Sequence, residues 1–289
     1  CAYCGQRLRA ETATEPTLLQ TPPSFSDRPQ DDSETVAFVS QRFAAASPPE
    51  HVAGFRLLRA LGSGGMGTVF EAIDERTELY VELKRVVSGI GVERDGGRRF
   101  SNEGKLASTI EHPRCVFVLA ADEYEGRPYI VMELMPGATL QSYIEEKGPL
   151  PVAEAVTKIL DVIEGLRQAH RQGVVHRDVK PSNCFLDVEG RVKVGDFGLS
   201  KSLAEDAHLT RTGAFVGTPL YASPEQIKGD EVDERTDVYS VAATLYYLLT
   251  GRPPFKEADA TATIARIVTE SPAPLRNLRP ALPPGLDAV

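Results

Sequence analysis

The sequence contains the stretch His176-Arg177-Asp178-Val179-Lys180-Pro181-Ser182-Asn183, and thirteen positions after Asn183 it continues with Asp196-Phe197-Gly198. Together the two stretches supply a proton acceptor and two metal ligands. The carboxylate of Asp178 can accept the proton of an attacking hydroxyl, and the side-chain oxygens of Asn183 and Asp196 are ligands that magnesium prefers. A phosphoryl-transfer site needs these groups and few others. The two motifs together therefore indicate transfer of a phosphoryl group to a hydroxyl.

The composition agrees with a soluble globular protein of one large domain or two modest ones. The chain has 289 residues, of which 42% are hydrophobic and 25% charged. A formal net charge of −9 argues against partners that are nucleic acids or anionic membranes. No apolar run is long enough to span a bilayer, and no signal peptide opens the chain. Four scattered cysteines do not form a disulfide framework, which favours a reducing, cytoplasmic setting.

The first 52 residues are expected to lie outside the folded domain. Cys1 and Cys4, within residues 1–5, have the spacing of half a zinc ribbon, although two unremarkable terminal cysteines are the alternative. A closed zinc site needs four ligands, so this chain by itself is expected to hold no stable Zn²⁺. Residues 6–52 are rich in Thr, Pro, Ser, Ala and Glu and are predicted to form a flexible linker, with one short helix over Glu34–Ala46.

A glycine-rich stretch opens the folded part, and its candidate phosphate-binding residues are Leu61, Gly62, Ser63, Gly64, Gly65, Met66, Gly67 and Val69. In a dinucleotide-binding fold the last glycine of such a stretch opens a helix. Here residues 68–73 are β-branched or aromatic at several positions and predict a strand instead. The glycines therefore lie in a hairpin, where backbone N–H groups can approach triphosphate oxygens.

Lys84 lies on the next predicted strand, and a partner for it is predicted on a helix. Strand alternation places Glu82 and Lys84 on one face of residues 79–84. In the helix predicted over Arg98–Glu111, Glu103 lies on the apolar face, where a carboxylate needs a cation. A cation is therefore expected to meet Glu103.

With these motifs together, the chain resembles the eukaryotic-like protein kinases of bacteria, and their serine/threonine branch in particular. The resemblance implies an α+β bilobal kinase fold, with an antiparallel sheet and one helix in the N-lobe and a mainly helical C-lobe. It implies ATP and Mg²⁺ as cofactors, with Mn²⁺ as a substitute, and proteins bearing Ser or Thr as substrates. Asp178, Lys180, Lys84 and Glu103 are then the catalytic residues, with Lys84 and Glu103 forming an ion pair, and Asn183 and Asp196 hold the metal.

The resemblance also places the hinge between the lobes and the adenine pocket. Met132 guards the back of the pocket, backbone groups of Glu133 and Met135 bond the adenine edge, and Phe185 closes the pocket from below. Phe185 is larger than the residue usual there. Glu82 departs from the family pattern, which has alanine at this position, and is expected to weaken ATP binding because a desolvated charge beside adenine is unfavourable.

The kinase domain is expected over residues 53–289, with an N-lobe at 53–132 and a C-lobe at 136–289. After the segment bounded by residues 217–225, Asp237 opens an apolar helix and braces the catalytic loop in members of the family. The family's last helices are expected to be missing beyond Val289, including the arginine that pairs with the glutamate equivalent to Glu225.

Regulation by phosphorylation is expected from Arg177, which precedes Asp178 and needs a negative partner. Thr210 and Thr212 resemble the autophosphorylated pair of bacterial kinases, with a homodimer suggested for that reaction. The alternative for the two threonines is that they are ordinary loop hydroxyls. Two other functions stay open: a pseudokinase that binds nucleotide or acts as a scaffold, and a kinase-like phosphotransferase acting on small molecules.

Overall fold

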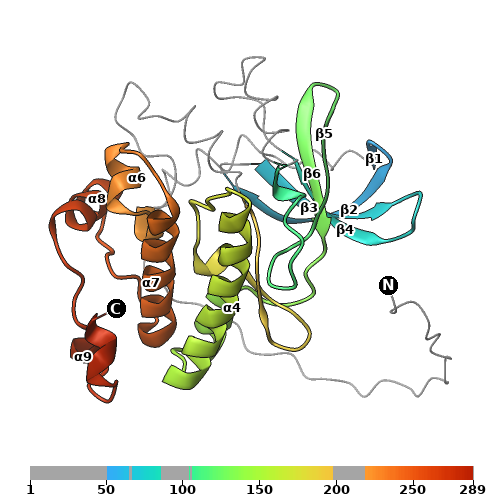
Figure 1. The fold of residues 1–289 in the computed structure, drawn as a ribbon. Helices are drawn as coiled ribbons and strands as arrows, with labels where there is room; N and C mark the ends of the chain where they lie inside the picture. The colour runs from blue at the N-terminus through green and yellow to red at the C-terminus, as the bar shows by residue number, and fades with distance from the viewer. Residues whose placement is uncertain (1–50, 65–66, 86–103, 105, 198–218, 289) are drawn as a thin grey trace, which may run out of the picture. The chain divides into compact units, whose positions relative to one another are not determined.

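The computed structural model of the chain describes residues 51–64, 67–85, 104, 106–197 and 219–288. All of these residues belong to one compact unit, Pro48–Val289. An antiparallel sheet forms the first half of this unit, and helices form most of the second half (Figure 1). The α+β class predicted from the sequence is confirmed. The short helix predicted over Glu34–Ala46 lies outside the described residues.

Within the described residues the sheet has six strands in the order β1-β2-β3-β4-β6-β5, and every pair of neighbouring strands is antiparallel. The strands are β1 (His51–Val52), β2 (Phe55–Gly64), β3 (Gly67–Asp74), β4 (Tyr80–Arg85), β5 (Val118–Tyr124) and β6 (Arg127–Glu133). In β4, Val81 and Leu83 are buried at 2% and 0% exposure, as the alternation of the strand predicts. Gly64 pairs with Gly67 across β2 and β3, so the glycine-rich stretch does lie at the turn of a hairpin.

The sheet begins two residues earlier than the sequence predicts. His51 and Val52, which the composition assigns to the linker, pair with Arg56 and Phe55 of β2. Val52 is 1% exposed and belongs to the apolar cluster of the sheet. The prediction missed this short strand because its two residues are too few to show a period.

The helical part begins after β6. It contains the helices α3 (Leu140–Lys147), α4 (Val152–Arg171), α6 (Pro224–Lys228), α7 (Glu234–Thr250), α8 (Ala260–Thr269) and α9 (Leu275–Leu278), and the short 3-10 helices η2 (Pro181–Asn183), η3 (Pro219–Tyr221) and η4 (Pro284–Ala288). A two-stranded hairpin, β7 (Cys184–Leu186) and β8 (Val192–Val194), follows η2.

The ends of the longer helices follow from local signals in the sequence. Thr139 caps α3 by accepting a hydrogen bond from the Ser142 N–H. Helix α7 begins earlier than expected because the side chain of Asp233 accepts from a backbone N–H in its first turn. The same helix ends at Gly251, whose φ of 72° requires the left-handed conformation that glycine adopts freely.

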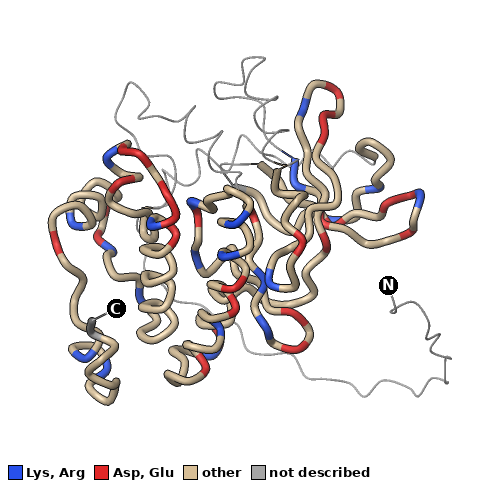
Figure 2. Tube along the Cα trace, viewed as in Figure 1, with Lys and Arg blue, Asp and Glu red and all other residues tan. Residues whose placement is uncertain are grey.

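Apolar faces of α4, α7 and the β7–β8 hairpin form the largest core cluster, and α4 and α7 lie side by side (Figure 1). Val162 of α4, Leu248 of α7 and Val194 of β8 are each 0% exposed. Basic and acidic residues are interspersed over both the sheet and the helices in the described trace (Figure 2). None of the helices in the described ranges is long and apolar enough to cross a membrane.

Candidate active site

The loop between α4 and β7 brings Asp178, Lys180 and Asn183 together. The Lys180 ammonium donates to Oδ2 of Asp178 at 2.7 Å, and the Asn183 amide donates to the same oxygen at 3.1 Å and to the Asp178 carbonyl at 2.9 Å. Asn183 is 6% exposed, whereas the Asp178 side chain is 25% exposed. The carboxylate is therefore held by two donors while one edge stays open to a substrate.

Asp237 of α7 accepts hydrogen bonds from the backbone of the loop between α4 and β7. Its carboxylate is 0% exposed and accepts from the N–H groups of His176 and Arg177 at 2.9 and 2.8 Å, and it contacts Nε2 of His170 at 2.7 Å. Arg177 has a φ of 68°, an unfavourable conformation for a residue with a side chain. The buried carboxylate fixes the loop in a conformation that it would not otherwise keep.

The second motif meets the first through His176. Its Nε2 lies 2.8 Å from the Gly195 carbonyl, and its ring packs on Phe197 with centroids 4.7 Å apart. Asp196 between them has a φ of 62°. This arrangement directs the Asp196 carboxylate toward β4, where Lys84 donates to its Oδ1 at 2.9 Å. Lys84 is 6% exposed, so this contact joins the sheet to the catalytic loop region through a buried ammonium.

The expected partner of Lys84 cannot be compared with this contact, because Glu103 lies outside the described residues. Of the helix predicted over residues 98–111, the structure describes 104 and 106–111. The helix extends only to Ala107 and a turn follows it, so its end lies earlier than predicted. Ala107 and Ile110 are both buried. The other sequence-based site residues outside the described ranges are Cys1, Cys4, Gly65, Met66, Thr210 and Thr212.

The residues assigned to the adenine pocket form one small apolar cluster. Val116, Ile130 and Met132 are buried in it, and Met135 and Phe185 pack against them. Gly195 is required here, since a Cβ at this position would lie 2.8 Å from the Phe185 ring. A cavity of about 10 Å³ beside Met132 is also lined by Asp196 and Phe197. The structure thus places Met132, Met135 and Phe185 beside the second motif.

The phosphate-binding stretch and Lys84 lie on neighbouring strands. Val69 pairs with Lys84 across β3 and β4, while Ser63 pairs with Thr68 across β2 and β3. Leu61 is 39% exposed on β2. A hairpin rich in glycine therefore lies next to the strand that carries the buried ammonium.

Glu82 lies next to Met132 in the register of the sheet, two residues before Lys84. Burial and the nearby negative charge of Asp196 raise the pKa of Glu82 to about 7, and the positive charge of Lys84 offsets this only in part. The carboxyl therefore changes its charge near neutral pH, at the edge of the candidate nucleotide site.

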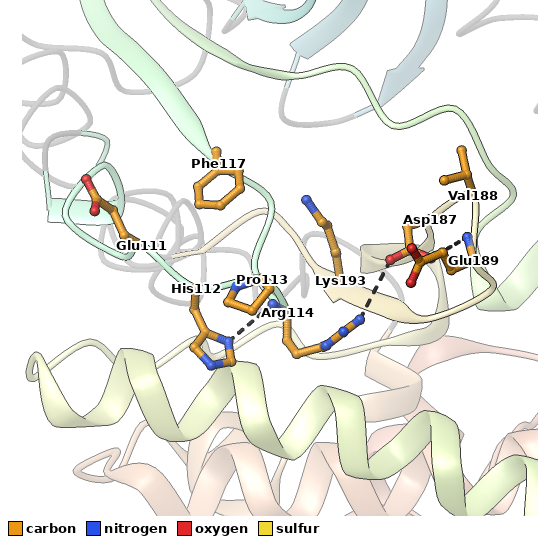
Figure 3. Close-up of a pocket in the computed structure, with 9 residues that line it drawn as sticks. All are labelled: Glu111, His112, Pro113, Arg114, Phe117, Asp187, Val188, Glu189 and Lys193. Carbon is orange, nitrogen blue, oxygen red and sulfur yellow. Dashed lines mark hydrogen bonds and ion pairs between the residues drawn. The ribbon is translucent and has the colours of Figure 1, made fainter. Parts of the chain in front are cut away.

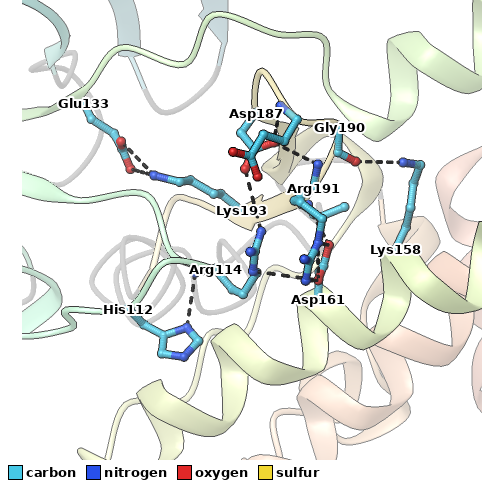
Figure 4. Close-up of polar contacts among 11 residues, drawn as sticks. His112, Arg114, Glu133, Lys158, Asp161, Asp187, Gly190, Arg191 and Lys193 are labelled. Carbon is cyan, nitrogen blue, oxygen red and sulfur yellow. Dashed lines mark hydrogen bonds and ion pairs between the residues drawn. The ribbon is translucent and has the colours of Figure 1, made fainter. Parts of the chain in front are cut away.

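Sequence reasoning missed an ion pair at Glu133, in the segment expected from the resemblance to be the hinge. Lys193 of β8 donates to both carboxylate oxygens of Glu133 at 2.7 and 2.9 Å (Figure 4). The N–H of Phe117 donates to Oε1 of the same carboxylate at 2.9 Å. The Glu133 side chain is thus bound on the side of the β7–β8 hairpin. The sequence offers one weak signal for this pair, since Lys193 is a lone charge between the buried Val192 and Val194.

A second polar cluster anchors the same hairpin to α4 (Figure 4). Asp161 of α4 is 3% exposed and accepts from Nε of Arg191 at 3.0 and 3.1 Å and from the Val192 N–H at 3.0 Å. Arg114 approaches Asp161 at 3.8 Å from the loop before β5. The hairpin that carries Lys193 is therefore fixed on both sides.

The oxygen atoms available at the site fit a divalent metal bound together with phosphate. Asn183 donates its amide N–H groups to Asp178, which leaves its side-chain oxygen free to act as a ligand, and Asp196 supplies a carboxylate. Within the described ranges no three His, Cys, Asp or Glu side chains form a metal site by themselves. This donor set suits Mg²⁺, which typically uses one or two protein oxygens plus phosphates and water.

Comparison with known proteins places the chain in a family. The protein kinase domain model matches residues 55–281. The serine/threonine-protein kinase PknB of Mycobacterium leprae is 37% identical over 247 residues, which are 84% of this chain and 40% of the relative. A probable serine/threonine-protein kinase of Corynebacterium efficiens is 36% identical over 244 residues, which are 81% of this chain and 37% of the relative.

The solved structures agree. The kinase domain of PknI from Mycobacterium tuberculosis matches with a TM-score of 0.66 and 27% identity, covering 82% of this chain and 87% of that chain. The chain belongs to the protein kinase family. Members of this family use ATP with a divalent metal, and the relatives named above are serine/threonine kinases. The chain spans about 40% of the length of the PknB proteins that it matches.

Proposed function

We propose that the protein transfers the γ-phosphoryl group of ATP to serine or threonine hydroxyls of other proteins. The observation that carries this proposal is the joined set of side chains Asp178, Lys180, Asn183, Asp196 and Lys84, linked through His176 within one site. Such a set matches the needs of phosphoryl transfer, in which positioning and charge stabilisation supply most of the rate enhancement.

Asp178, Lys180 and Lys84 have distinct roles in this proposal. Asp178 orients the attacking hydroxyl and accepts its proton on the open edge of the carboxylate. Lys180, a point charge within reach of Asp178, stabilises negative charge that builds on the transferring group. Lys84 is proposed to stabilise the negative charge of the α- and β-phosphates. Glu103 is proposed to position Lys84 by an ion pair.

The nucleotide is proposed to lie between Met132 and Phe185, which belong to one apolar cluster. The backbone of Glu133 and Met135 then lies at the adenine edge, where its N–H and C=O groups can donate and accept hydrogen bonds. This position leaves the triphosphate directed toward the glycine-rich hairpin of β2 and β3.

Asn183 and Asp196 are proposed to hold the metal, which supplies charge neutralisation for the phosphate oxygens when bound. The donors are oxygen atoms, which favours Mg²⁺ and accommodates Mn²⁺. Lys84 contacts Oδ1 of Asp196, so the other carboxylate oxygen can serve as a ligand. Zn²⁺ at Cys1 and Cys4 is not needed for any of these roles.

Incubation of the protein with labelled ATP, Mg²⁺ and a generic protein substrate tests the proposal. We expect the label on serine or threonine residues of the protein substrate. Nucleotide binding without transfer would instead indicate a pseudokinase, and transfer only to small molecules would indicate a small-molecule phosphotransferase. Acid hydrolysis of the labelled protein identifies the modified amino acid directly.

A further inference from the structure

The peptide unit that joins Arg177 to Asp178 is held at both of its polar atoms. The Arg177 carbonyl accepts a hydrogen bond from the side-chain amide of Gln226 at 2.7 Å, and the Asp178 N–H donates to Nδ1 of His176 at 3.3 Å. Arg177 has a φ of 68°, which is unfavourable for a residue with a side chain. The conformation of the backbone that carries the Asp178 side chain therefore depends on a contact from outside the loop.

Gln226 and Asp237 hold the two sides of Arg177. The Arg177 N–H donates to Oδ1 of Asp237 at 2.8 Å, and its carbonyl accepts from Gln226. The two contacts together fix both peptide planes that flank the strained residue, because a residue has only two soft backbone dihedrals. Without Gln226 the plane that leads into Asp178 is free to rotate, while the plane held by Asp237 stays in place.

The side-chain amide of Gln226 has two ends, and its own helix uses only one of them. The amide oxygen accepts from the Ser223 N–H at 3.0 Å, and the Ser223 hydroxyl accepts from the Gln226 N–H at 3.4 Å, which forms a capping box at the start of α6. A glutamate serves a capping box equally well. The amide nitrogen has no part in the cap, and it is this nitrogen that donates to the Arg177 carbonyl. The contact with the catalytic loop is therefore what requires glutamine at position 226.

The capping box is attached to buried residues of α7. Ser223 is 0% exposed, and its hydroxyl lies 3.3 Å from that of Thr236, which is also 0% exposed and donates to Glu225 at 2.7 Å. Thr236 lies in the first turn of α7, one residue before Asp237. The two groups that hold Arg177 are therefore both anchored at the same turn of α7.

We propose that Gln226 is a positioning residue for phosphoryl transfer, which holds the Arg177 carbonyl so that the Asp178 carboxylate faces the attacking hydroxyl. The inference rests on the proposed function, because it concerns the orientation of the group that accepts the hydroxyl proton. Gln226 acts through Asp178. Its loss therefore lowers the rate of transfer and leaves nucleotide binding as it was.

Four variants separate this role from the cap. Gln226→Glu keeps the acceptor that the capping box needs and removes the donor to Arg177. Gln226→Met removes both without adding a charge. Ser223→Ala removes the hydroxyl of the cap and leaves both ends of the Gln226 amide paired, because the Ser223 N–H remains. Val188→Glu adds the same negative charge as Gln226→Glu at an 87% exposed side chain of the β7–β8 turn (Figure 3).

Hydrogen exchange of the whole 289-residue chain, with mass spectrometry of a peptide that contains residues 174–180, measures the order of the loop without any turnover. We expect exchange to be several-fold faster in the two Gln226 variants than in wild type, and unchanged in Ser223→Ala and Val188→Glu. Exchange at the wild-type rate in both Gln226 variants would overturn the proposal. An equal increase in a peptide from α4 would show a general loss of stability and would overturn it too.

Transfer from labelled ATP to a protein substrate measures the consequence for the reaction. We expect kcat to fall by about fivefold or more in both Gln226 variants, with the KM for ATP nearly unchanged. In the Asp178→Asn background, Gln226→Glu should cause no further fall, because the two residues act as one unit.

A fall of equal size in both backgrounds, or a fall in Gln226→Glu without one in Gln226→Met, would overturn the positioning role. No transfer by wild-type protein would instead contradict the proposed function. The exchange measurement would in that case still decide whether Gln226 holds the loop.

Discussion

Glu82 stands where the resemblance to the kinase family leads us to expect alanine. A carboxyl group that would be charged in water lies partly buried next to Met132, with Asp196 as a further negative neighbour. Because its pKa is about 7, the Glu82 carboxyl is mostly neutral in the folded protein below pH 7. The raised pKa also makes the free energy of unfolding depend on pH. Below the ordinary pKa of 4.5 the carboxyl is neutral in both the folded and the unfolded protein, and stability is lost as the pH rises from there through about 7.

We predict that Glu82→Ala tightens nucleotide binding severalfold at pH 8 and has little effect at pH 6. Above its pKa the carboxylate repels the phosphates and is poorly solvated, whereas below it the group is neutral. Glu82→Gln should behave as Glu82→Ala does, because it is neutral at every pH. Titration of a fluorescent ATP analogue at several pH values measures the effect. A ratio of wild-type to variant affinity that does not depend on pH would contradict this interpretation.

Lys193 is predicted to be a positioning residue for the hinge. Replacement by methionine removes two hydrogen bonds to Glu133 within a partly buried ion pair, so the hinge backbone becomes less ordered. We expect the KM for ATP to rise by roughly two- to tenfold, with kcat little changed. Lys193→Arg should restore most of the affinity. The same KM in the methionine and arginine variants would show that the ion pair does not position the hinge.

At the scale of elements, the contact between α4 and α7 determines the geometry of the catalytic loop. His170 near the end of α4 and Asp237 in the first turn of α7 meet at 2.7 Å, directly beneath the backbone of the loop. The hydrogen bond to Asp237 raises the pKa of His170, against the opposing effect of burial, and Glu234 at 3.8 Å adds to the rise.

We predict that His170→Gln lowers the free energy of unfolding by about 1–3 kcal/mol at pH 6. The contribution of protonated His170 is fully present below pH 6.5 and is lost as the pH rises through its raised pKa. The difference between wild type and variant should therefore shrink at alkaline pH. Urea unfolding at a series of pH values measures it. A difference that stays constant from about pH 6 to pH 9 would mean that the proton on His170 has no part in stability.

The segment that follows Asp196-Phe197-Gly198 is predicted to control activity through Arg177. The Arg177 N–H is bound by Asp237 and its carbonyl accepts from Gln226 at 2.7 Å, so the backbone at this position is fixed while the guanidinium can pair with an added phosphate. We expect active protein to carry phosphate on Thr210, Thr212 or both, and alanine at both positions to lower activity severalfold or more.

Mass spectrometry of ATP-treated enzyme, before and after phosphatase treatment, measures this modification. Ser202→Ala removes another hydroxyl from the same segment and serves as the matched control, with activity expected to stay close to that of wild type. Full activity of enzyme with neither threonine modified would reject the mechanism.

At the scale of the whole molecule, the sequence predicted the features that are local and missed those that join distant residues. The hairpin of β2 and β3 follows from the glycine-rich stretch and from the β-branched and aromatic residues after it. Roles for Asp178 and Asp196 could be proposed from the sequence because each lies in a short motif. Lys193 and Glu133 are 60 residues apart, and His170 and Asp237 are 67 apart, so only the folded chain brings them together.

The contact between Lys84 and Asp196 is a further case. These residues are 112 positions apart. The sequence suggests a role for each of them but does not predict that they contact each other. The strand β1 was missed for a different reason, since its stability comes from the burial of Val52 and not from a pattern in His51 and Val52. Tertiary burial overrides local preference in such short elements.

Asp178 is central to the proposed activity, because it activates the protein hydroxyl for phosphoryl transfer, and one comparison tests this role most directly. Wild-type protein and Asp178→Asn are incubated with labelled ATP, Mg²⁺ and a protein substrate, and the binding of an ATP analogue is measured in parallel. We predict that the variant binds the analogue about as well as wild type does, while its transfer to serine and threonine falls by roughly 100-fold or more. Transfer by the variant at the wild-type rate, or no transfer by either protein, would contradict the account.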